Sequence, residues 1–194
     1  CLRGSSWQKN FPPDSSRSED EEPALLLATF FHDAIYDVRS GTNEEDSAVL
    51  FQNFADEMGM DSEVPCLRFK VVDYILATKK HAVSEDNPLA LSLFLDMDMA
   101  VLGKEKKAYL HYANMIRKEY SHVPLEEYCE KRADTLESFL RQPIFGTRVM
   151  FQSFEEKARE NLQDEIDSLR IGVIPFMPPS RKWFLRRIRE HRKH

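Results

Sequence analysis

Cysteine is scarce in this chain of 194 residues, and the cysteines that it has do not lie near one another in the sequence. Cys1, Cys66 and Cys129 show no spacing that is typical of a metal-binding or redox motif. We therefore expect no disulfide framework and predict a reducing compartment, the cytoplasm. The chain also lacks any apolar run of the roughly 18 residues that a membrane-spanning helix needs. These absences argue against a disulfide-stabilised scaffold and against a helical membrane protein.

An alternating strand pattern and an internal repeat are also absent. From Pro23 onward the apolar residues recur with the period of an α-helix, which predicts an all-α fold, a compact multi-helix bundle. The first helix is expected from Pro23 to about Tyr36 and mostly buried. The other expected helices are 42–58, 64–81, 88–102, one that carries Tyr109 to Tyr120, one that begins at Pro124, and one that carries Phe151 to Leu169.

The length suits one domain with one core, flanked by two atypical ends. Residues 1–22 are rich in Ser, Asp, Glu and Pro, so we predict that they are disordered. Residues 23–172 form the predicted helical domain. Residues 173–194 read as a Pro-containing linker followed by a basic tail.

The net charge of −6 is unevenly distributed along the chain. Residues 181–194 contain seven Lys or Arg and one Glu, a net of +6, which leaves −12 for the remainder. An acidic body argues against nucleic-acid binding. The basic tail contains interleaved apolar residues, so contact with an acidic membrane is a weaker alternative to a solvated, partly packed helix.

The residues most informative about function are His32 and Asp33, which directly follow the apolar run from Leu25 to Phe31. Imidazole and carboxylate groups are both good ligands for divalent metals, and ionisable groups in apolar surroundings are costly unless something satisfies them. Two further carboxylates, Asp96 and Asp98, interrupt another apolar run. We interpret the two interruptions as one shared metal site. The alternative for His32 is a core histidine hydrogen-bonded to a neighbouring helix.

Four blocks in this order resemble the predicted metal-dependent phosphohydrolases of the HD superfamily, helical proteins named for a His-Asp doublet. The resemblance covers roughly residues 23–170. Its blocks are ATFFHDAIYDVRSGTNEEDSA (28–48), ATKKH (77–81), LFLDMDMAVLG (93–103) and YANMIRKEYSHVP (112–124).

The resemblance implies hydrolysis of a small phosphorylated metabolite or nucleotide by a metal-activated water. The metal would be Mn²⁺, Fe²⁺, Co²⁺, Ni²⁺, Zn²⁺ or Mg²⁺. The superfamily pattern is a first His on an upstream helix, then the doublet, here His32 and Asp33, then a later Asp. Asp98 matches that Asp better than Asp96, which is the alternative ligand or a hydrogen-bond partner of the site. No His precedes His32, so we expect a fragment or an altered gene product that lacks the first ligand helix.

Further acidic residues follow the doublet. Asp37 comes four residues after Asp33 and is a candidate to orient the attacking water or to act as its base; a solvated helix end is the alternative. Glu44 and Glu45 resemble acidic positions that activate water in some HD enzymes. Glu45 also fits a capping box with Thr42, which we favour for this residue.

Basic residues supply the candidate phosphate contacts. His81 ends the block ATKKH and is a candidate metal ligand, phosphate contact or general acid, or else a helix-end residue that interacts with the helix dipole. Lys79 and Lys80 are candidate phosphate contacts, or a solvated face. Arg117 lies beside an apolar stripe and is a candidate phosphate clamp, or else a partner in an ion pair.

A different class of function remains open, because losing one ligand weakens a metal site. The chain would then be a catalytically silent HD-type domain that serves as a binding or interaction module. An HD-type lyase or hydratase is a third alternative, since the same metal chemistry acts on other substrates.

Overall fold

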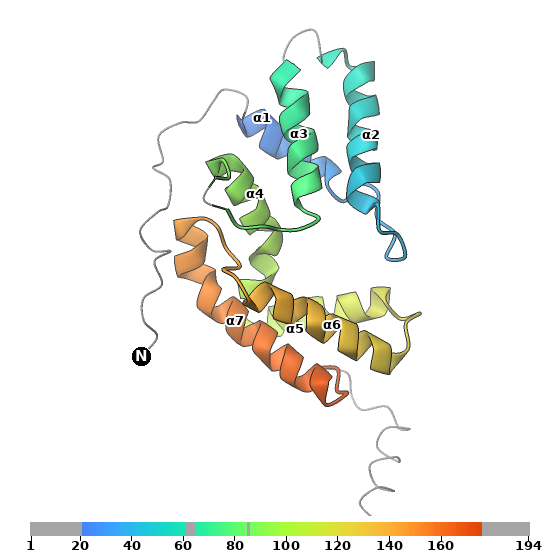
Figure 1. Cartoon of the computed structure of the whole chain (residues 1–194), viewed down its shortest axis with the longest axis vertical. Helices are drawn as coiled ribbons and strands as arrows, with labels where there is room; N and C mark the ends of the chain where they lie inside the picture. The colour runs from blue at the N-terminus through green and yellow to red at the C-terminus, as the bar shows by residue number, and fades with distance from the viewer. Residues whose placement is uncertain (1–20, 61–64, 85, 176–194) are drawn as a thin grey trace, which may run out of the picture. The chain divides into compact units, whose positions relative to one another are not determined.

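The computed structural model describes residues 21–60, 65–84 and 86–175 (Figure 1). Within these ranges the chain forms helices and no strand, so the predicted all-α class is confirmed. The helices are α1 (Glu21–Phe31), α2 (Asn43–Glu57), α3 (Pro65–Ala77), α4 (Leu89–Met99), the 3₁₀ helix η3 (Ala100–Gly103), α5 (Lys106–Glu119), α6 (Leu125–Leu140) and α7 (Arg148–Arg170). None of the helices in the described ranges combines the length and hydrophobicity that crossing a membrane requires.

The chain divides into two compact units, and the single domain expected from the sequence stays a prediction. Unit 1 consists of Cys1–Ala100 and Pro143–Glu155, and unit 2 of Val101–Gln142 and Glu156–His194. Hydrophobic periodicity identifies helices but not which of them share a core, so the division is a tertiary property. The predicted disordered segment lies outside the described residues except for Glu21 and Glu22, which begin α1, and the basic tail 181–194 lies outside them entirely.

Unit 1 is built on α3, against which both α1 and α2 pack, while α4 packs on α1 and α3 (Figure 1). Ala24 and Ala28 are fully buried, so two small side chains form the inward face of α1. Phe51 of α2 and Ile75 of α3 are also fully buried. Burying a side chain of this size contributes about 1.5–3 kcal/mol to stability. These contacts fix the positions of the ends of α1, α3 and α4.

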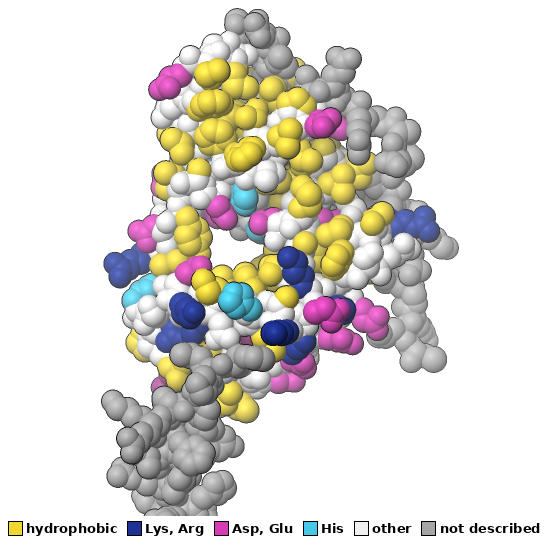
Figure 2. Space-filling view, turned by 180° about the vertical axis from the view of Figure 1, so that it is seen from behind, with side chains coloured by type: hydrophobic (Ala, Val, Ile, Leu, Met, Phe, Trp, Pro, Cys, Tyr) yellow, Lys and Arg dark blue, Asp and Glu magenta, His cyan; other side chains and the backbone are white. Residues whose placement is uncertain are grey.

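Helix α1 is neither as long nor as buried as the sequence predicts. It ends at Phe31 rather than near Tyr36, so His32 and Asp33 lie in the turn that follows it. The alanines face inward, and Leu26 and Phe30 are 55% and 78% exposed. Figure 2 shows apolar side chains gathered on one face of unit 1. The prediction was wrong because a run that is apolar all round does not reveal which face will find a partner.

Helix α3 also ends early, at Ala77, and residues 78–81 continue it as a series of turns. Thr78, Lys79 and Lys80 each donate a backbone hydrogen bond to the carbonyl three residues earlier. His81 closes the series with φ of 45°, in the left-handed region that non-glycine residues seldom occupy. Helix α4 likewise tightens into η3 at Ala100 instead of continuing to 102. The left-handed conformation at His81 directs the chain out of the helical path at the end of α3.

Unit 2 has its own core and its own buried polar group. Tyr109, Leu136 and Leu162, from α5, α6 and α7, are fully or almost fully buried. The Tyr109 hydroxyl donates a hydrogen bond to Glu165, and Arg132 Nε lies 3.0 Å from Glu165 Oε1. We call Tyr109, Arg132 and Glu165 the Tyr–Arg–Glu group; it joins the three long helices of unit 2.

A candidate metal centre in unit 1

Four side chains from three segments of unit 1 meet in one group. His32 Nε2 lies 3.6 Å from Asp98 Oδ1 and 3.5 Å from Asp33 Oδ2. His81 Nε2 lies 2.6 Å from Asp98 Oδ2. The Asp98 carboxylate therefore lies between two imidazoles, one from the end of α1 and one from the turns after α3. We call His32, Asp33, His81 and Asp98 the His–Asp cluster.

His32 is oriented by its own helix and by an aromatic ring. Its backbone N–H donates to the Ala28 carbonyl at 2.9 Å, and its Nδ1 lies 3.1 Å from the Thr29 carbonyl oxygen. A carbonyl only accepts hydrogen bonds, so Nδ1 carries the proton and Nε2 is the atom that faces Asp98. The imidazole packs edge-on against Phe94, with ring centroids 5.6 Å apart. This is the orientation that a metal-ligating histidine needs, with one nitrogen fixed and the other facing its partner.

His81 reaches the cluster from an unfavourable backbone conformation. The left-handed conformation costs free energy in a residue with a Cβ, and such positions occur at functional sites when surrounding contacts maintain them. Here the contacts are the bond from its backbone N–H to the Ala77 carbonyl, at 3.1 Å, and the short bond to Asp98. The sequence predicts His81 as a site residue, and the structure brings it directly onto Asp98.

Electrostatics within the cluster are dominated by Asp98. Its interaction with His32 raises the pKa of His32 to about 9, although partial burial acts in the opposite direction. Burial disfavours the charged form of Asp98, but His32 and His81 outweigh it and hold the pKa of Asp98 well below its ordinary value. Burial, with the charges of Asp98 and Glu44, raises the pKa of Asp33. The cluster is thus a network of ion pairs around one firmly ionised carboxylate.

Lys79 connects the turns that carry His81 to the start of α2. Lys79 Nζ is 2.5 Å from Glu45 Oε1, 2.8 Å from the Gly41 carbonyl oxygen and 4.0 Å from Glu44 Oε2. The negative charge of Glu44 contributes to the raised pKa of Asp33.

The capping box predicted for Glu45 does not form. Helix α2 begins at Asn43 without a side-chain cap hydrogen bond from Thr42. The Thr42 hydroxyl instead donates to Asp46 Oδ2 at 2.9 Å, and Glu45 binds Lys79. Lys79, in the turns after α3, competes for Glu45, and this contact is not evident from the local sequence.

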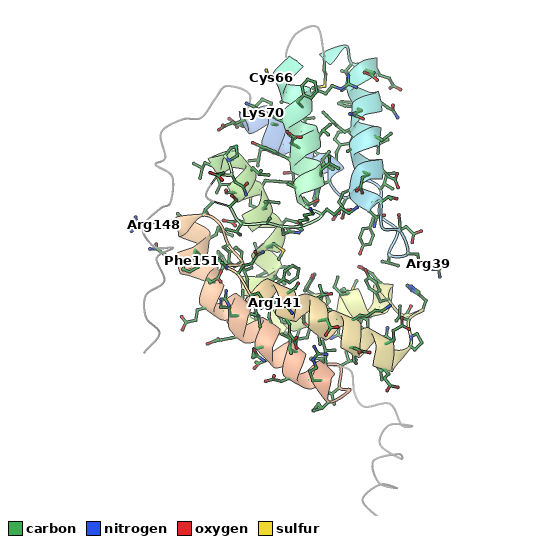
Figure 3. The ribbon with its side chains drawn as sticks, in the orientation of Figure 1. Arg39, Cys66, Lys70, Arg141, Arg148 and Phe151 are labelled. Carbon is green, nitrogen blue, oxygen red and sulfur yellow. The ribbon has the colours of Figure 1, made fainter. Side chains whose placement is uncertain are left out.

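Asp37 does not lie one helical turn after Asp33, because α1 has already ended. It lies in the exposed loop before α2, where its Oδ1 accepts a hydrogen bond from the Arg39 backbone at 2.9 Å. Its own N–H donates to Asn43 Oδ1, also at 2.9 Å. Arg39 projects from this loop, away from the helices of unit 1 (Figure 3). The structure thus uses Asp37 to shape the loop and does not place it with the cluster.

Asp96 is separated from the cluster by its hydrogen bonds. Its side chain is buried, and Oδ1 accepts from the Gly146 N–H at 2.7 Å. Its Oδ2 accepts from the Thr147 N–H at 2.8 Å and from the Thr147 hydroxyl at 2.5 Å. Residues two apart in a helix point about 200° away from each other, so only one of Asp96 and Asp98 can face His32. That residue is Asp98, and Asp96 holds the segment that leads into α7.

The remaining candidates are divided between the two units. Lys80 is exposed in the turns after α3. Arg117 belongs to unit 2, where its guanidinium donates to the carbonyls of Tyr120 and Val123 and lies 4.6 Å from the centroid of the Tyr128 ring. These bonds close the turn between α5 and α6, so Arg117 has a structural explanation.

Sequence reasoning missed Ser47, a fully buried residue of α2. Its hydroxyl oxygen accepts from the Ile35 N–H at 3.0 Å and lies 3.3 Å from the Ile35 carbonyl. These bonds hold the backbone two residues after Asp33. The available signal was a small polar residue on the apolar face of a helix, beside Ala48 and Phe51.

The donor chemistry of the cluster suits a divalent metal, whereas its present geometry is that of ion pairs. Two imidazoles and two carboxylates are the ligand types that bind Zn²⁺, Mn²⁺ and related ions. Among the described residues, no group of three or more His, Cys, Asp or Glu side chains is arranged to hold an ion. His32 Nε2 and the oxygens of Asp33 and Asp98 would each have to turn toward a common point. Of these three side chains, Asp33 has the most room to turn, because it is 66% exposed.

Comparison of the chain with models of protein families, with curated proteins and with solved structures finds no match.

Proposed function

We propose that unit 1 is a metal-dependent phosphohydrolase domain of the HD superfamily that acts on a small phosphorylated metabolite or nucleotide. The observation that supports this most is the position of Asp98 between His32 and His81, with Asp33 beside them. An ion-pair network that contains two histidines and is partly open to solvent is a candidate functional site. Its members come from three of the four blocks that resemble the HD superfamily, residues 28–48, 77–81 and 93–103.

His32, Asp33 and Asp98 are the proposed ligands of a divalent metal. When bound, such an ion supplies a Lewis acid for a phosphate oxygen and lowers the pKa of water to near neutrality. His81 donates to Asp98 and either orients that carboxylate or becomes a fourth ligand. Asp96 is not included, because both of its oxygens already accept hydrogen bonds.

The neighbouring residues would complete the reaction. Glu44, whose negative charge acts on Asp33, is the proposed acceptor of a proton from the attacking water. Lys79 Nζ would exchange Glu45 for a phosphate oxygen and offset its charge. Lys80, which directly follows Lys79 in the turns after α3, would add a second positive charge. Asp37 and Arg117 are left out because each is bound within its own loop or turn.

A second candidate function, a catalytically silent interaction module, is favoured by a separate observation. The members of the His–Asp cluster bind one another, and unit 1 exposes large apolar side chains, with Phe30 at 78% and Phe69 at 71%. Large exposed apolar groups mark interaction sites when they are contiguous. This function requires no metal.

The test is the Mn²⁺ content of the chain after loading and gel filtration, compared with His32→Ala. The matched control is His111→Ala, which removes an exposed imidazole from α5. We expect close to one Mn²⁺ per chain in the parent and in the control, and loss of binding in His32→Ala. Release of inorganic phosphate from a panel of phosphate monoesters would then establish the activity. Absence of metal from all three proteins would reject the enzyme and leave the interaction module.

A further inference from the structure

Four exposed side chains form a narrow row along one face of α5, in unit 2. Lys107, His111, Met115 and Lys118 follow one another at the spacing of a helical turn, which places them within about 80° of one another around the helix. Lys118 Nζ lies 4.0 Å from Met115 Sδ, so neighbours in the row are in contact at this end. The row is about 17 Å long and lies on the side of α5 opposite its buried residues. We call these four residues the basic stripe.

The lysines of the basic stripe lack the carboxylate partners that other lysines of unit 2 have. Lys106, Lys131 and Lys157 are each paired with a carboxylate of the same unit. Within the part of the chain that the structure describes, neither Lys107 nor Lys118 has such a pair. The stripe therefore keeps an unneutralised positive charge, in a chain whose net charge is −6.

The acidic residue of α5 lies outside the stripe. Glu119 directly follows Lys118 and therefore points about 100° away from it. A row of positive charges at the spacing of helical turns is complementary to carboxylates that follow one another at the same spacing, as on the acidic face of a helix. Such complementarity speeds association and fixes the register of the partner. Met115 adds a flexible apolar side chain that can pack against an apolar residue between those acids.

We propose that the basic stripe binds an acidic helical segment of a partner protein. A membrane surface or a nucleic acid extends well beyond one helix face and would also meet the acids that the next helix of unit 2, α6, exposes, among them Glu126, Glu127 and Glu130. Repulsion from these acids disfavours such broad polyanions. A single helix, about 10 Å across, is narrow enough to contact the stripe alone. The proposal concerns unit 2 and does not depend on the metal centre of unit 1.

The test is the affinity of the full chain for a fluorescein-labelled peptide of sixteen residues that repeats Glu-Ala-Ala-Leu, measured by fluorescence anisotropy at about 50 mM NaCl. Its counterpart repeats Gln-Ala-Ala-Leu and so lacks the carboxylates. A chelator is present throughout, so that the proposed metal site plays no part. We expect the Glu peptide to bind about tenfold more tightly than the Gln peptide, the combined effect of a few exposed charge pairs. The difference should shrink at about 300 mM NaCl, because salt screens exposed charges.

The stripe variant combines Lys107→Gln with Lys118→Gln and should lose the preference for the Glu peptide. The matched control combines Lys131→Gln with Lys157→Gln, which removes the same charge from two other lysines of unit 2 that reach solvent, and it should keep the preference. Circular dichroism melts confirm that each variant is folded. Equal affinity of the parent for the two peptides, or an equal loss in both variants, would overturn the proposal.

Two broad polyanions serve as comparison ligands: phosphatidylcholine vesicles that contain phosphatidylserine, and a short DNA duplex. We expect both to bind more weakly than the Glu peptide. Tighter binding of either one, lost in the stripe variant and kept in the control, would replace the acidic helix by a membrane or a nucleic acid and so overturn the proposal as well.

Discussion

Both units contain ionisable side chains drawn from different helices, yet the two groups differ in exposure and in composition. In the Tyr–Arg–Glu group of unit 2, the side chains of Glu165 and Arg132 are 2% and 12% exposed. In the His–Asp cluster of unit 1, the side chains of Asp98 and Asp33 are 29% and 66% exposed. One group is closed to solvent, and the other is open to it.

The difference shows how a structural ion pair can be told from a candidate site. Glu165 accepts hydrogen bonds from Tyr109 and Arg132, so each carboxylate oxygen is occupied, and no histidine is present. The group joins three helices and leaves little room for a ligand. The His–Asp cluster contains imidazole and carboxylate groups, which are metal ligands, and its acids are within reach of solvent. Accessibility and ligand type, rather than charge alone, separate the two.

The largest expected effect comes from breaking the Tyr–Arg–Glu group. Glu165→Ala leaves the Arg132 guanidinium buried without its counter-charge, which should lower the free energy of unfolding by about 3–5 kcal/mol. Urea denaturation followed by circular dichroism measures the loss, and hydrogen exchange should show that it is concentrated in α5, α6 and α7. Asp164→Ala is the control, because its pair with Lys106 is exposed and is worth no more than about 1 kcal/mol. Equal losses in the two variants would contradict the structural role of Glu165.

A smaller effect separates the two aspartates of α4. Asp96→Ala leaves the N–H groups of Gly146 and Thr147 without their acceptor, which should cost about 3 kcal/mol of stability. The folded protein should nevertheless retain its affinity for Mn²⁺. Asp98→Ala should do the reverse, with loss of Mn²⁺ binding and a smaller loss of stability, because its side chain is partly exposed. Paired urea denaturation and Mn²⁺ titration distinguish the two, and loss of Mn²⁺ from folded Asp96→Ala would contradict this assignment.

The sequence predicts the members of the cluster better than their surroundings. His32, Asp33, Asp96 and Asp98 became candidates because ionisable residues interrupt apolar helical runs, and the family resemblance favoured Asp98 over Asp96. The structure brings His32, Asp33 and Asp98 together with His81. The helical class follows from periodicity in the same way. Both predictions rest on local sequence patterns.

What the sequence does not predict depends on contacts between distant segments. Helix α1 ends early where the chain turns to bind Ser47, 12 residues beyond Ile35. Glu45 binds Lys79, 34 residues away, instead of forming the capping box. Asp96 accepts a hydrogen bond from Thr147, 51 residues away. In each case a tertiary partner competes with the local pattern.

The smallest expected effect is a dependence of stability on pH that arises from His32 of the His–Asp cluster. In the metal-free protein the pKa of His32 is raised to about 9, from an ordinary value near 6.5. Below pH 6.5 the imidazole is protonated in both the folded and the unfolded chain, so its contribution to stability is fully present. As the pH rises from 6.5 to 9, the unfolded chain loses the proton first, and the contribution declines until it is gone above 9.

The carboxylate that pairs with His32 does not titrate in this range. The pKa of Asp98 lies well below its ordinary value, so its contribution is lost only in acid. Burial raises the pKa of Tyr109, and Glu165 outweighs burial to raise that of Arg132, so across this range the Tyr109 hydroxyl keeps its proton and Arg132 keeps its charge. Melting temperatures measured from pH 6 to 9.5 in the presence of a chelator should therefore fall in the parent and in His111→Gln. The His32→Gln variant should show a flatter profile, and an unchanged slope would mean that the pairing of His32 with Asp98 does not stabilise unit 1.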